Sequence, residues 1–409
     1  MARFRILSAA VLLGAAILAC ASPIASQPLD QAATAVVQTL SAVSTAAPLA
    51  SPAAPLPAPT QTPAPAPAVL PHSLYYQNKD QGGRVQVFRL ATDGRTVQQI
   101  TFEPANVDQF DVSPVDGSVA YTSNNQLILV DSNGAGRRIL VDGGPVDDNN
   151  RFVNSVGSPV WSLDGRTIAF SHGGLNFYSV SDGAISKVLE NQIDMTAGFA
   201  IPHELYAGDR YSPDGSRLLI SISFYEGGEF GIYRPADNTV IRINRPDGSM
   251  VCCELRWVPD SSGLYAASRS IGMVDSGLSY IDASSGKVTI LLPGSAPDAT
   301  YNFAAGPQVG RDGKLYFFFN NLPQIPVASH TPLYLVRSET DGATGRTTLK
   351  PDAFPYINEV LWAPDASLAI VVQGTADDVN VGGVAEIVYP NDKPNARLLD
   401  SAQDLHWGP

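Results

Sequence analysis

Five polar side chains recur at one position of a spaced pattern, and their types suit ligand binding. Each directly precedes a member of a largely aromatic column that returns at intervals of about fifty residues, and they are Asp111, Arg210, Arg256, Gln308 and His406. Guanidinium groups bind carboxylates through paired N–H donors, and aspartate and histidine add an acceptor and a titratable group. We therefore predict a site for a carboxylate-bearing or peptide ligand. The alternative interpretation is that these side chains only hold neighbouring repeats together.

Sequence motifs for catalysis or metal binding are absent. No G-x-S-x-G segment marks a nucleophilic serine, and the five histidines have no paired spacing for zinc. The run Asp147-Asp148-Asn149-Asn150 is rich in oxygen ligands but lacks the spacing and glycine of a calcium loop, so we interpret it as a solvated turn. The sequence thus predicts no catalytic residue, metal or cofactor. An enzyme that gathers its residues from several repeats stays open.

Cys252 and Cys253 are adjacent in the sequence. Adjacent Cα atoms lie about 3.8 Å apart, closer than the roughly 4.4 Å that disulfides ordinarily need, so a bridge between them would strain the peptide. Such strain accompanies some ligand platforms, and a disulfide at this pair is one hypothesis. Side chains that alternate across a strand would instead remain two separate thiols.

The first residues have the pattern of a secretion signal. Arg3 and Arg5 precede the apolar stretch Ile6–Leu18, which is too short to span a bilayer comfortably. The stretch ends in Ile17-Leu18-Ala19-Cys20, a segment that resembles the lipobox of bacterial lipoproteins. The resemblance implies that a signal peptide of residues 1–19 is removed and that Cys20 receives the lipid. An ordinary signal peptide is the alternative.

Residues 20–70 are predicted to be a disordered tether. They consist mostly of Ala, Pro, Ser and Thr, and Asp30 is their one charged residue. Alternating prolines favour an extended polyproline II chain of about 3.1 Å per residue, so the segment from Pro48 to Ala68 would reach ~65 Å. Such a spacer would hold a domain away from the membrane to which Cys20 is attached.

The elements that must position the five polar residues come from a repeat of about fifty residues. Its column, which includes all four tryptophans, consists of Val112, Trp161, Tyr211, Trp257, Val309, Trp362 and Trp407. A turn such as Ser212-Pro213-Asp214-Gly215 follows, in which proline fixes one backbone angle, aspartate caps the turn and glycine accepts positive φ. Each repeat holds four short strands, the size of one blade of a β-propeller.

The two ends of the repeat region complement each other. Asp404 to Pro409 supply only a first strand, whereas residues 73–101 supply strands two to four without a first. Joining them completes one blade, closes the ring and leaves no free sheet edge. We therefore predict an all-β domain over residues 71–409, a propeller of seven four-stranded antiparallel blades. Six or eight blades are the alternatives.

The Trp/Tyr-Ser-Pro-Asp-Gly columns resemble the repeats of TolB-like propellers, relatives of the WD-repeat family. The resemblance covers residues 71–409, and Ser212-Pro213-Asp214-Gly215 is the full copy of the motif. It implies a rigid docking disc in the cell envelope. The predicted blade number departs from the six blades of TolB, and the chain lacks a separate N-terminal globular domain, so a TolB-specific partner is not implied.

Connection lengths distinguish the two faces of the predicted ring. Turns between strands one and two and between strands three and four are short, and connections on the other face are long, at residues 142–157, 191–208, 270–277, 293–306, 321–332 and 374–383. Because binding residues concentrate on variable loops over a rigid scaffold, we expect recognition on this long-loop face. Neutral variation of tolerant surface loops is the alternative.

The net charge of the chain limits the classes of partner that it can bind. It carries 26 Lys and Arg against 39 Asp and Glu, a net charge of −13, which argues against nucleic acid or an anionic lipid surface as partner. We predict a monomeric, non-catalytic propeller outside the cytoplasmic membrane, periplasmic or on the cell surface, that contacts the membrane only through its lipid and binds a protein or peptide partner. The alternatives are a propeller hydrolase or lyase, and a small-molecule or sugar sensor with its site at the channel mouth.

Overall fold

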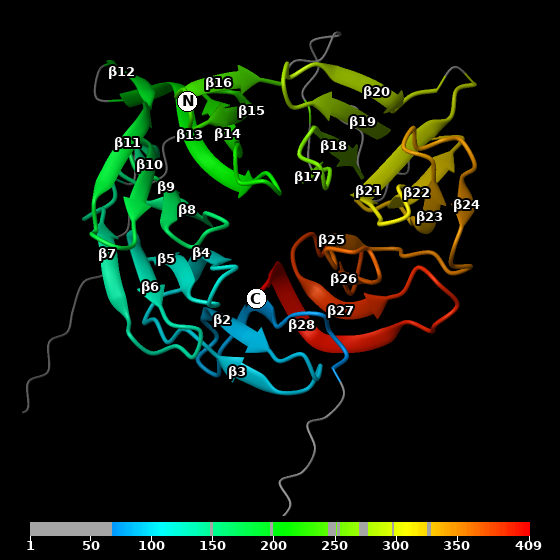
Figure 1. Cartoon of the computed structure of the whole chain (residues 1–409), viewed down its shortest axis with the longest axis horizontal. Coiled ribbons are helices and arrows are strands. Elements are labelled where there is room, and N and C mark those ends of the chain that lie inside the picture. The colour runs from blue at the N-terminus through cyan, green and yellow to red at the C-terminus, as the bar shows by residue number, and fades with distance from the viewer. Residues whose placement is uncertain are drawn as a thin grey trace, which may run out of the picture. The chain divides into compact units, whose positions relative to one another are not determined.

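Sheets arranged around a centre form the folded unit of the computed structural model (Figure 1). The structure describes residues 68–147, 150–196, 199–243, 251, 254–269, 277–296, 298–324 and 329–409, all within a compact unit that begins at Ala64. In these residues the one helical element is the 3-10 helix η1 (Arg151–Val153). No helix of the described residues is long and apolar enough to cross a membrane.

Antiparallel strands follow one another in units of four, which are called blades below. The first two complete blades hold β4 (Val107–Val112), β5 (Val119–Ser123), β6 (Gln126–Val130) and β7 (Arg138–Asp142), then β8 (Gly157–Trp161), β9 (Thr167–Ser171), β10 (Gly174–Ser179) and β11 (Ile185–Glu190). The next sheet has five strands, β12 (Gln192–Thr196), β13 (Phe199–Tyr211), β14 (Leu218–Phe224), β15 (Gly227–Arg234) and β16 (Thr239–Arg242). Two further blades hold β17 (Glu254–Trp257), β18 (Gly263–Ser268), β19 (Gly277–Asp282) and β20 (Val288–Leu292), then β21 (Tyr301–Val309), β22 (Leu315–Leu322), β23 (Tyr334–Ser338) and β24 (Thr347–Thr348).

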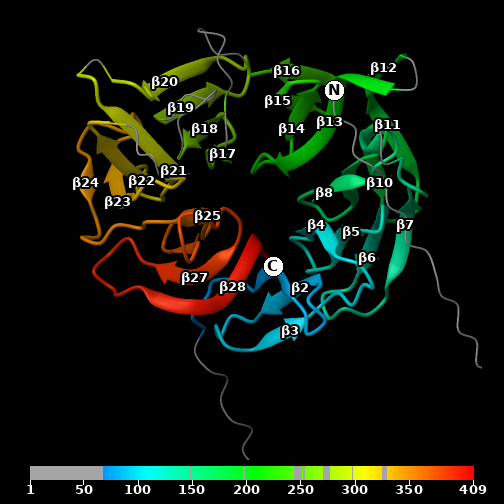
Figure 2. The same cartoon turned by 180° about the vertical axis from the view of Figure 1, so that it is seen from behind.

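The two ends of the folded unit share one sheet. Its order is β25 (Ile357–Trp362), β26 (Ala369–Gln373), β27 (Gly383–Val388), β28 (Ala396–Trp407), β1 (Leu74–Lys79), β2 (Val85–Leu90) and β3 (Val97–Gln99). The first half of β28 pairs with β27, and its second half pairs with β1 through Leu74 opposite Trp407 and Tyr75 opposite His406. This sheet therefore comprises two blades that share β28, so the described strands group into seven units, one of which has β12 as a fifth strand. Figure 2 shows β28 at this junction from behind, and the predicted closure by the C-terminal strand is confirmed.

The turn after the innermost strand forms as the Ser-Pro-Asp-Gly pattern predicts. The hydroxyl of Ser212 donates to Asp214 at 2.6 Å, and the amide of Gly215 donates to the carbonyl of Ser212 at 2.8 Å. Gly215 has φ of 71°, a conformation that a side chain would disfavour. The hydrogen bond from Ser212 lowers the pKa of Asp214 to about 2, so the capping carboxylate is charged at neutral pH.

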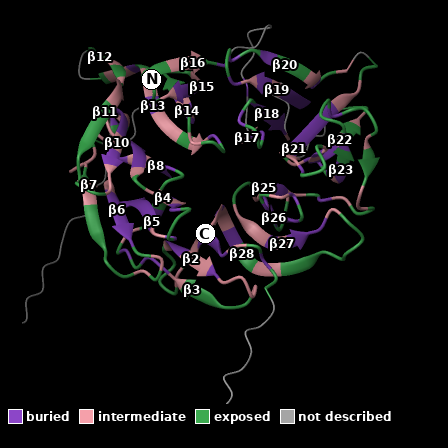
Figure 3. Ribbon diagram, in the orientation of Figure 1, coloured by how far each residue is buried: buried purple, intermediate pink, exposed green. Residues whose placement is uncertain are grey.

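Packing between neighbouring blades forms the core. Trp257 and Leu219 belong to one buried cluster, whereas Trp362 belongs to another. The Nε1 of Trp362 donates to the carbonyl of Gly306 and that of Trp407 donates to the carbonyl of Trp362, each at 2.7 Å, so both indoles tie their strand to the preceding blade. The outermost strands β3, β7 and β11 are largely exposed, in contrast to the buried inner strands (Figure 3).

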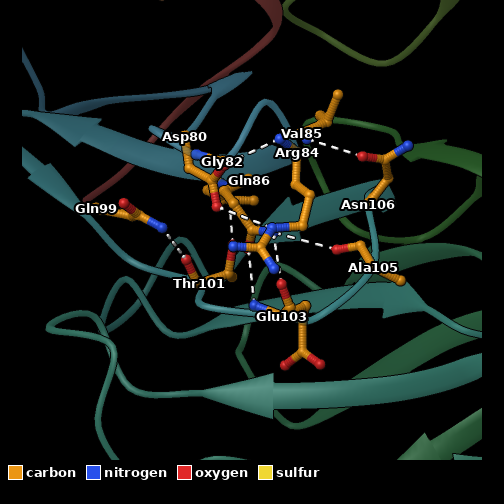
Figure 4. A network of polar contacts seen from close by, with 11 residues as sticks. Asp80, Gly82, Arg84, Val85, Gln86, Gln99, Thr101, Glu103, Ala105 and Asn106 are labelled. Atoms are coloured by element: carbon orange, nitrogen blue, oxygen red, sulfur yellow. Dashed lines mark hydrogen bonds and ion pairs between the residues drawn. The ribbon is translucent and has the colours of Figure 1, made fainter. Parts of the chain in front are cut away.

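Gln86 on β2 holds the segment that crosses from β3 to β4 (Figure 4). Its buried side chain donates to the carbonyls of Glu103 and Ala105 at 3.1 and 3.2 Å and accepts from the hydroxyl of Thr101 at 2.8 Å. The carboxylate of Glu103 points away from Gln86 and accepts a hydrogen bond from Nε of Arg137 at 2.7 Å. A buried amide costs free energy unless it is paired, so this network fixes the crossing between the closing blade and the next one.

The segment 191–208, which we expected to be a long loop, is mainly a strand pair. It forms β12 and most of β13, which pair through Asp194 opposite Ile201 and Ile193 opposite Pro202. Pairing satisfies backbone groups that a loop would leave to solvent, and β-branched residues such as Ile193 and Ile201 favour it. The expectation of a loop here was therefore wrong.

Candidate functional site

Four of the five polar residues predicted to bind a ligand line one cavity of about 470 Å³. Asp111 comes from β4, Arg210 from β13, Arg256 from β17 and His406 from β28. These are the innermost strands of their blades, which surround the centre of the ring in Figure 1. We call this cavity the axial pocket. Strands far apart in the sequence thus bring an acid, two arginines and a histidine together.

Gln308 does not line the axial pocket. Its Nε2 donates to the carbonyl of Val309 at 3.1 Å. The register of β21 against β22 shifts between Ala305 and Gln308, and such a bulge re-aims the side chains next to it. The structure therefore does not group Gln308 with the other four residues.

His406 lies between two carboxylates. Its Nδ1 is 3.1 Å from Oδ1 of Asp111 and its Nε2 is 3.1 Å from Oδ1 of Asp404, while its ring centroid is 4.5 Å from that of Phe110. Burial lowers the pKa of His406, but the charge of Asp404 and the hydrogen bonds to both carboxylates outweigh burial and raise the pKa to about 10. His406 is therefore an imidazolium at neutral pH and donates from both nitrogens.

The two arginines of the axial pocket differ in how they are neutralised. Arg210 donates from Nε to Asp209 at 2.5 Å, and the charge of Asp209 raises its pKa. Arg256 donates to the carbonyl of Val360, and its guanidinium makes no other hydrogen bond to the described residues. Burial and the neighbouring charge of Arg210 lower the pKa of Arg256 to about 10. Most of the N–H donors of Arg256 are thus left for a ligand.

Acidic side chains complete the walls of the axial pocket and of a smaller cavity beside it. Asp209, Glu359 and Asp404 line the axial pocket, and Glu254 lines the second cavity, of about 180 Å³. The two cavities share Arg256 and Glu359 as well as Asp209 and Arg210. Burial raises the pKa of the Glu359 carboxyl. Positive and negative groups are therefore interleaved around the centre of the ring.

Sequence reasoning missed these acids. Glu254 and Glu359 stand two residues before Arg256 and Leu361 in their strands, so the alternation of side chains places them on the same face as the polar column. Scanning that second position could have found both. Asp404 gives no such signal, because it has φ of 52° within a strand whose register shifts.

Three carboxylates of the innermost strands also join successive blades. Asp111 accepts from the backbone amide of Trp161 at 2.6 Å, Glu254 from that of Gly306 at 2.6 Å, and Glu359 from that of Leu405 at 2.6 Å. Charge-assisted hydrogen bonds of this kind are stronger than neutral ones. The side chain of Asp111 therefore both joins two blades and lines the axial pocket.

Other predicted features can be placed only in part. Cys20, Cys252 and Cys253 lie outside the described residues, as do Asp148 and Asn149. Among the residues that the structure does describe, no group of three or more His, Cys, Asp and Glu is arranged to hold a metal ion. Pro114 and Leu163, from the short turns that follow β4 and β8, belong to the lining of the axial pocket. Recognition on the long-loop face stays a prediction.

No protein-family model and no curated protein matches the chain. Solved structures do match it. A protein from Lactobacillus plantarum has a TM-score of 0.50 at 12% identity, over 82% of this chain and 99% of that one. A puromycin-hydrolyzing peptidase of Mycobacterium tuberculosis has a TM-score of 0.50 at 14% identity, over 82% of this chain and 53% of that one. TolB from Acinetobacter baumannii has a TM-score of 0.41 at 13% identity, over 79% of this chain and 78% of that one.

The likeness is one of fold. Together with the strand pairing, it confirms the predicted class, an all-β propeller of four-stranded antiparallel blades. Proteins of such low identity share architecture without sharing substrates or partners, so the function must be argued from the site itself.

Proposed function

We propose that this propeller is a non-catalytic binding module that stands outside the cytoplasmic membrane and takes a carboxylate-bearing segment of a protein or peptide partner into the axial pocket. The observation that carries the proposal is the guanidinium of Arg256, which makes one hydrogen bond to the described residues and lines a cavity of about 470 Å³ together with Arg210. A guanidinium with free N–H donors matches the two oxygens of a carboxylate.

The electrostatics of the two arginines favour an anion. The charge of Arg210 opposes the charge of Arg256, which is one cause of the lowered pKa of Arg256. A carboxylate placed against Arg256 would relieve this repulsion and would replace the water lost on burial with charge-assisted hydrogen bonds. The acids that surround the arginines would at the same time discriminate against ligands of high negative charge.

The state of His406 supports binding rather than proton transfer. A general base needs a neutral imidazole with a free nitrogen, whereas both nitrogens of His406 are bonded to carboxylates and its pKa is raised to about 10. In the proposed function His406 is a positioning residue. It holds Asp111 and Asp404 in place and compensates their charge.

The proposed location rests on the N-terminal residues. Cys20 would carry the lipid and residues 21–70 would separate the propeller from the membrane. Growth with a labelled fatty acid tests this step, because Cys20→Ser should abolish incorporation and release the protein from the membrane fraction. Incorporation that persists in Cys20→Ser would overturn the lipid anchor and leave the axial pocket untouched.

Site-specific photocrosslinking in cells tests the binding function. A photoreactive residue at Leu163, which lines the pocket and is 43% exposed, should capture a partner, whereas one at the exposed Val381 should not. Arg256→Gln should abolish the adduct and Arg256→Lys should weaken it, while Arg166→Gln, on a side chain that is 85% exposed, should leave it unchanged.

Two results would overturn the binding function. One is an adduct that survives Arg256→Gln, and the other is the absence of a specific adduct at Leu163. Where a partner is captured, replacing the Asp and Glu residues of its crosslinked segment by Asn and Gln should also remove the adduct. An adduct that is insensitive to that change would reject the carboxylate as the recognised group.

A further inference from the structure

A second cavity, of about 560 Å³, lies between the blade of β17–β20 and the blade of β21–β24. It shares no residue with the lining of the axial pocket. We call it the tyrosine cleft and define it by Pro259, Asp260, Tyr265, Tyr280, Leu291 and Asp341. Pro259 and Asp260 come from the turn after β17, and Asp341 comes from the turn after β23 in the next blade.

The two tyrosines are held in place by the chain around them. Their ring centroids are 5.5 Å apart at an interplanar angle of 67°, and the hydroxyl of Tyr265 donates to the carbonyl of Thr340 at 2.9 Å. Tyr265 is buried, whereas Tyr280 is half-buried. Gly263 makes room for Tyr280, because a Cβ at that position would lie 2.4 Å from its hydroxyl oxygen. A pre-ordered aromatic face therefore borders the cavity.

Two fixed negative charges stand at this aromatic face. Asp260 accepts from the hydroxyl and the amide of Ser262 at 2.7 and 3.0 Å, and the bond from the hydroxyl is the main cause of its lowered pKa. Asp341 accepts from the hydroxyl and the amide of Thr344 at 2.5 and 2.8 Å, with the same consequence. Neither carboxylate forms an ion pair with a side chain of the described residues.

Arg346, whose charge acts on Asp341, is bound elsewhere. Arg346 donates to the carbonyl of Gly342 at 3.1 Å, and its guanidinium lies over the ring of Phe319, 3.8 Å from the centroid. The charge of Arg346 weakens the field of Asp341 but does not occupy the cleft.

We propose that the tyrosine cleft binds an extended, apolar segment of a partner protein that carries an arginine or lysine, with the cation against Tyr280 and between Asp260 and Asp341. Aromatic faces and carboxylates attract the same cation, and Leu291 and Pro259 offer apolar surface to its neighbours. The net charge of −13 favours a basic partner over an acidic one. The tether of this chain does not fit, because Asp30 is its one charged residue.

Selection from a random peptide library on the full chain tests the proposal. The selected peptides should contain Arg or Lys beside apolar residues. Replacing that cation by methionine should weaken binding about ten-fold, in line with the larger cation–π and ion-pair contributions. Tyr280→Ala and Asp341→Asn should each lower affinity by a similar factor, whereas Tyr280→Phe should retain binding and so report an intact cleft.

Matched controls separate this site from the axial pocket and from general effects of charge. Asp182→Asn changes a turn-capping aspartate in another blade, and Tyr225→Ala removes a tyrosine that is 71% exposed. Both variants, and Arg256→Gln, should leave the peptides bound. The failure of the axial-pocket function and the failure of the cleft are therefore distinguishable.

Three results would overturn the proposal. They are a library that yields no basic peptides, peptides that still bind Tyr280→Ala, and displacement of the peptides by a synthetic copy of residues 48–68. The last result would assign the cleft to the tether of the chain itself.

Discussion

The axial pocket and the tyrosine cleft fix their charges in different ways. In the axial pocket, Asp111 and Glu359 bond to backbone amides of the neighbouring blade, so the groups that face the cavity also hold the ring together. In the tyrosine cleft, Asp260 and Asp341 bond only within their own turns. Substitutions of the Asp111 and Glu359 carboxylates should therefore change stability and binding together, whereas substitutions of the cleft carboxylates should change binding alone.

The largest effect is expected for Asp111→Ala. It would remove the acceptor of the Trp161 amide and one acceptor of His406, and breaking a largely buried, charge-assisted network costs about 3 kcal/mol. Urea denaturation would measure the loss in free energy of unfolding. Asp182→Ala, which removes a local turn cap, is the control and should cost much less than Asp111→Ala. Equal losses for the two variants would contradict the difference between the regions.

His406 should make the stability of the ring depend on pH. Its folded-state pKa, about 10, lies above the ordinary histidine pKa of 6.5, so its contribution is complete below pH 6.5 and is lost as the pH rises through 10. We expect the free energy of unfolding to fall over this range. His406→Gln should remove that slope, whereas His203→Gln, on the exposed hairpin of β12 and β13, should retain it. A wild-type profile without a slope would contradict the assignment.

Gly263→Ala tests how tightly the tyrosine cleft is built. The new Cβ would lie 2.4 Å from both the Tyr280 hydroxyl and the Ile281 carbonyl, so backbone or ring must shift, at a cost of between about 1 and 2 kcal/mol. Thermal unfolding measures the cost, and the selected basic peptides should bind more weakly. Gly228→Ala is the control, because its nearest neighbour would be 3.3 Å away. Unchanged stability and binding in Gly263→Ala would show that the cleft adapts freely.

The smallest effect on stability is expected for Arg256→Met, which separates the arginine from the carboxylates of the same pocket. Burial and the charge of Arg210 both act against the charged form of Arg256, and its guanidinium makes one hydrogen bond to the described residues. The free energy of unfolding should stay within about 1 kcal/mol of the parent or rise. Crosslinking from Leu163 should nevertheless be lost. A large loss of stability would mean that Arg256 is a structural contact.

The fold could be predicted because its signals are local and repeated. Trp161, Trp257, Trp362 and Trp407 mark the same position in four blades. The four residues from Ser212 to Gly215 are enough to predict the turn that they form. The strand pair in 191–208 could not be read in this way, because it adds to one blade only.

The candidate sites could be predicted only where one column carries them. Asp111, Arg210, Arg256 and His406 share a repeat position and meet in the axial pocket, but Gln308 shares that position and does not. The tyrosine cleft depends on where two blades meet and on Gly263, which leaves room for the ring of Tyr280. Neither feature can be predicted from one repeat position. Distances between blades are a property of packing, and packing follows from all of the repeats at once.

Closure of the ring by β28 also affects when the two sites form during folding. Gln403 donates to Gln77 across a separation of 326 residues, and contacts so distant in sequence form late in folding. His406 belongs to the same strand, so the axial pocket is incomplete until β28 has paired with β1. The strands that form the tyrosine cleft, β17 to β24, all precede β28 in the sequence. Occupancy of the axial pocket would therefore report that the ring has closed, whereas occupancy of the tyrosine cleft would not.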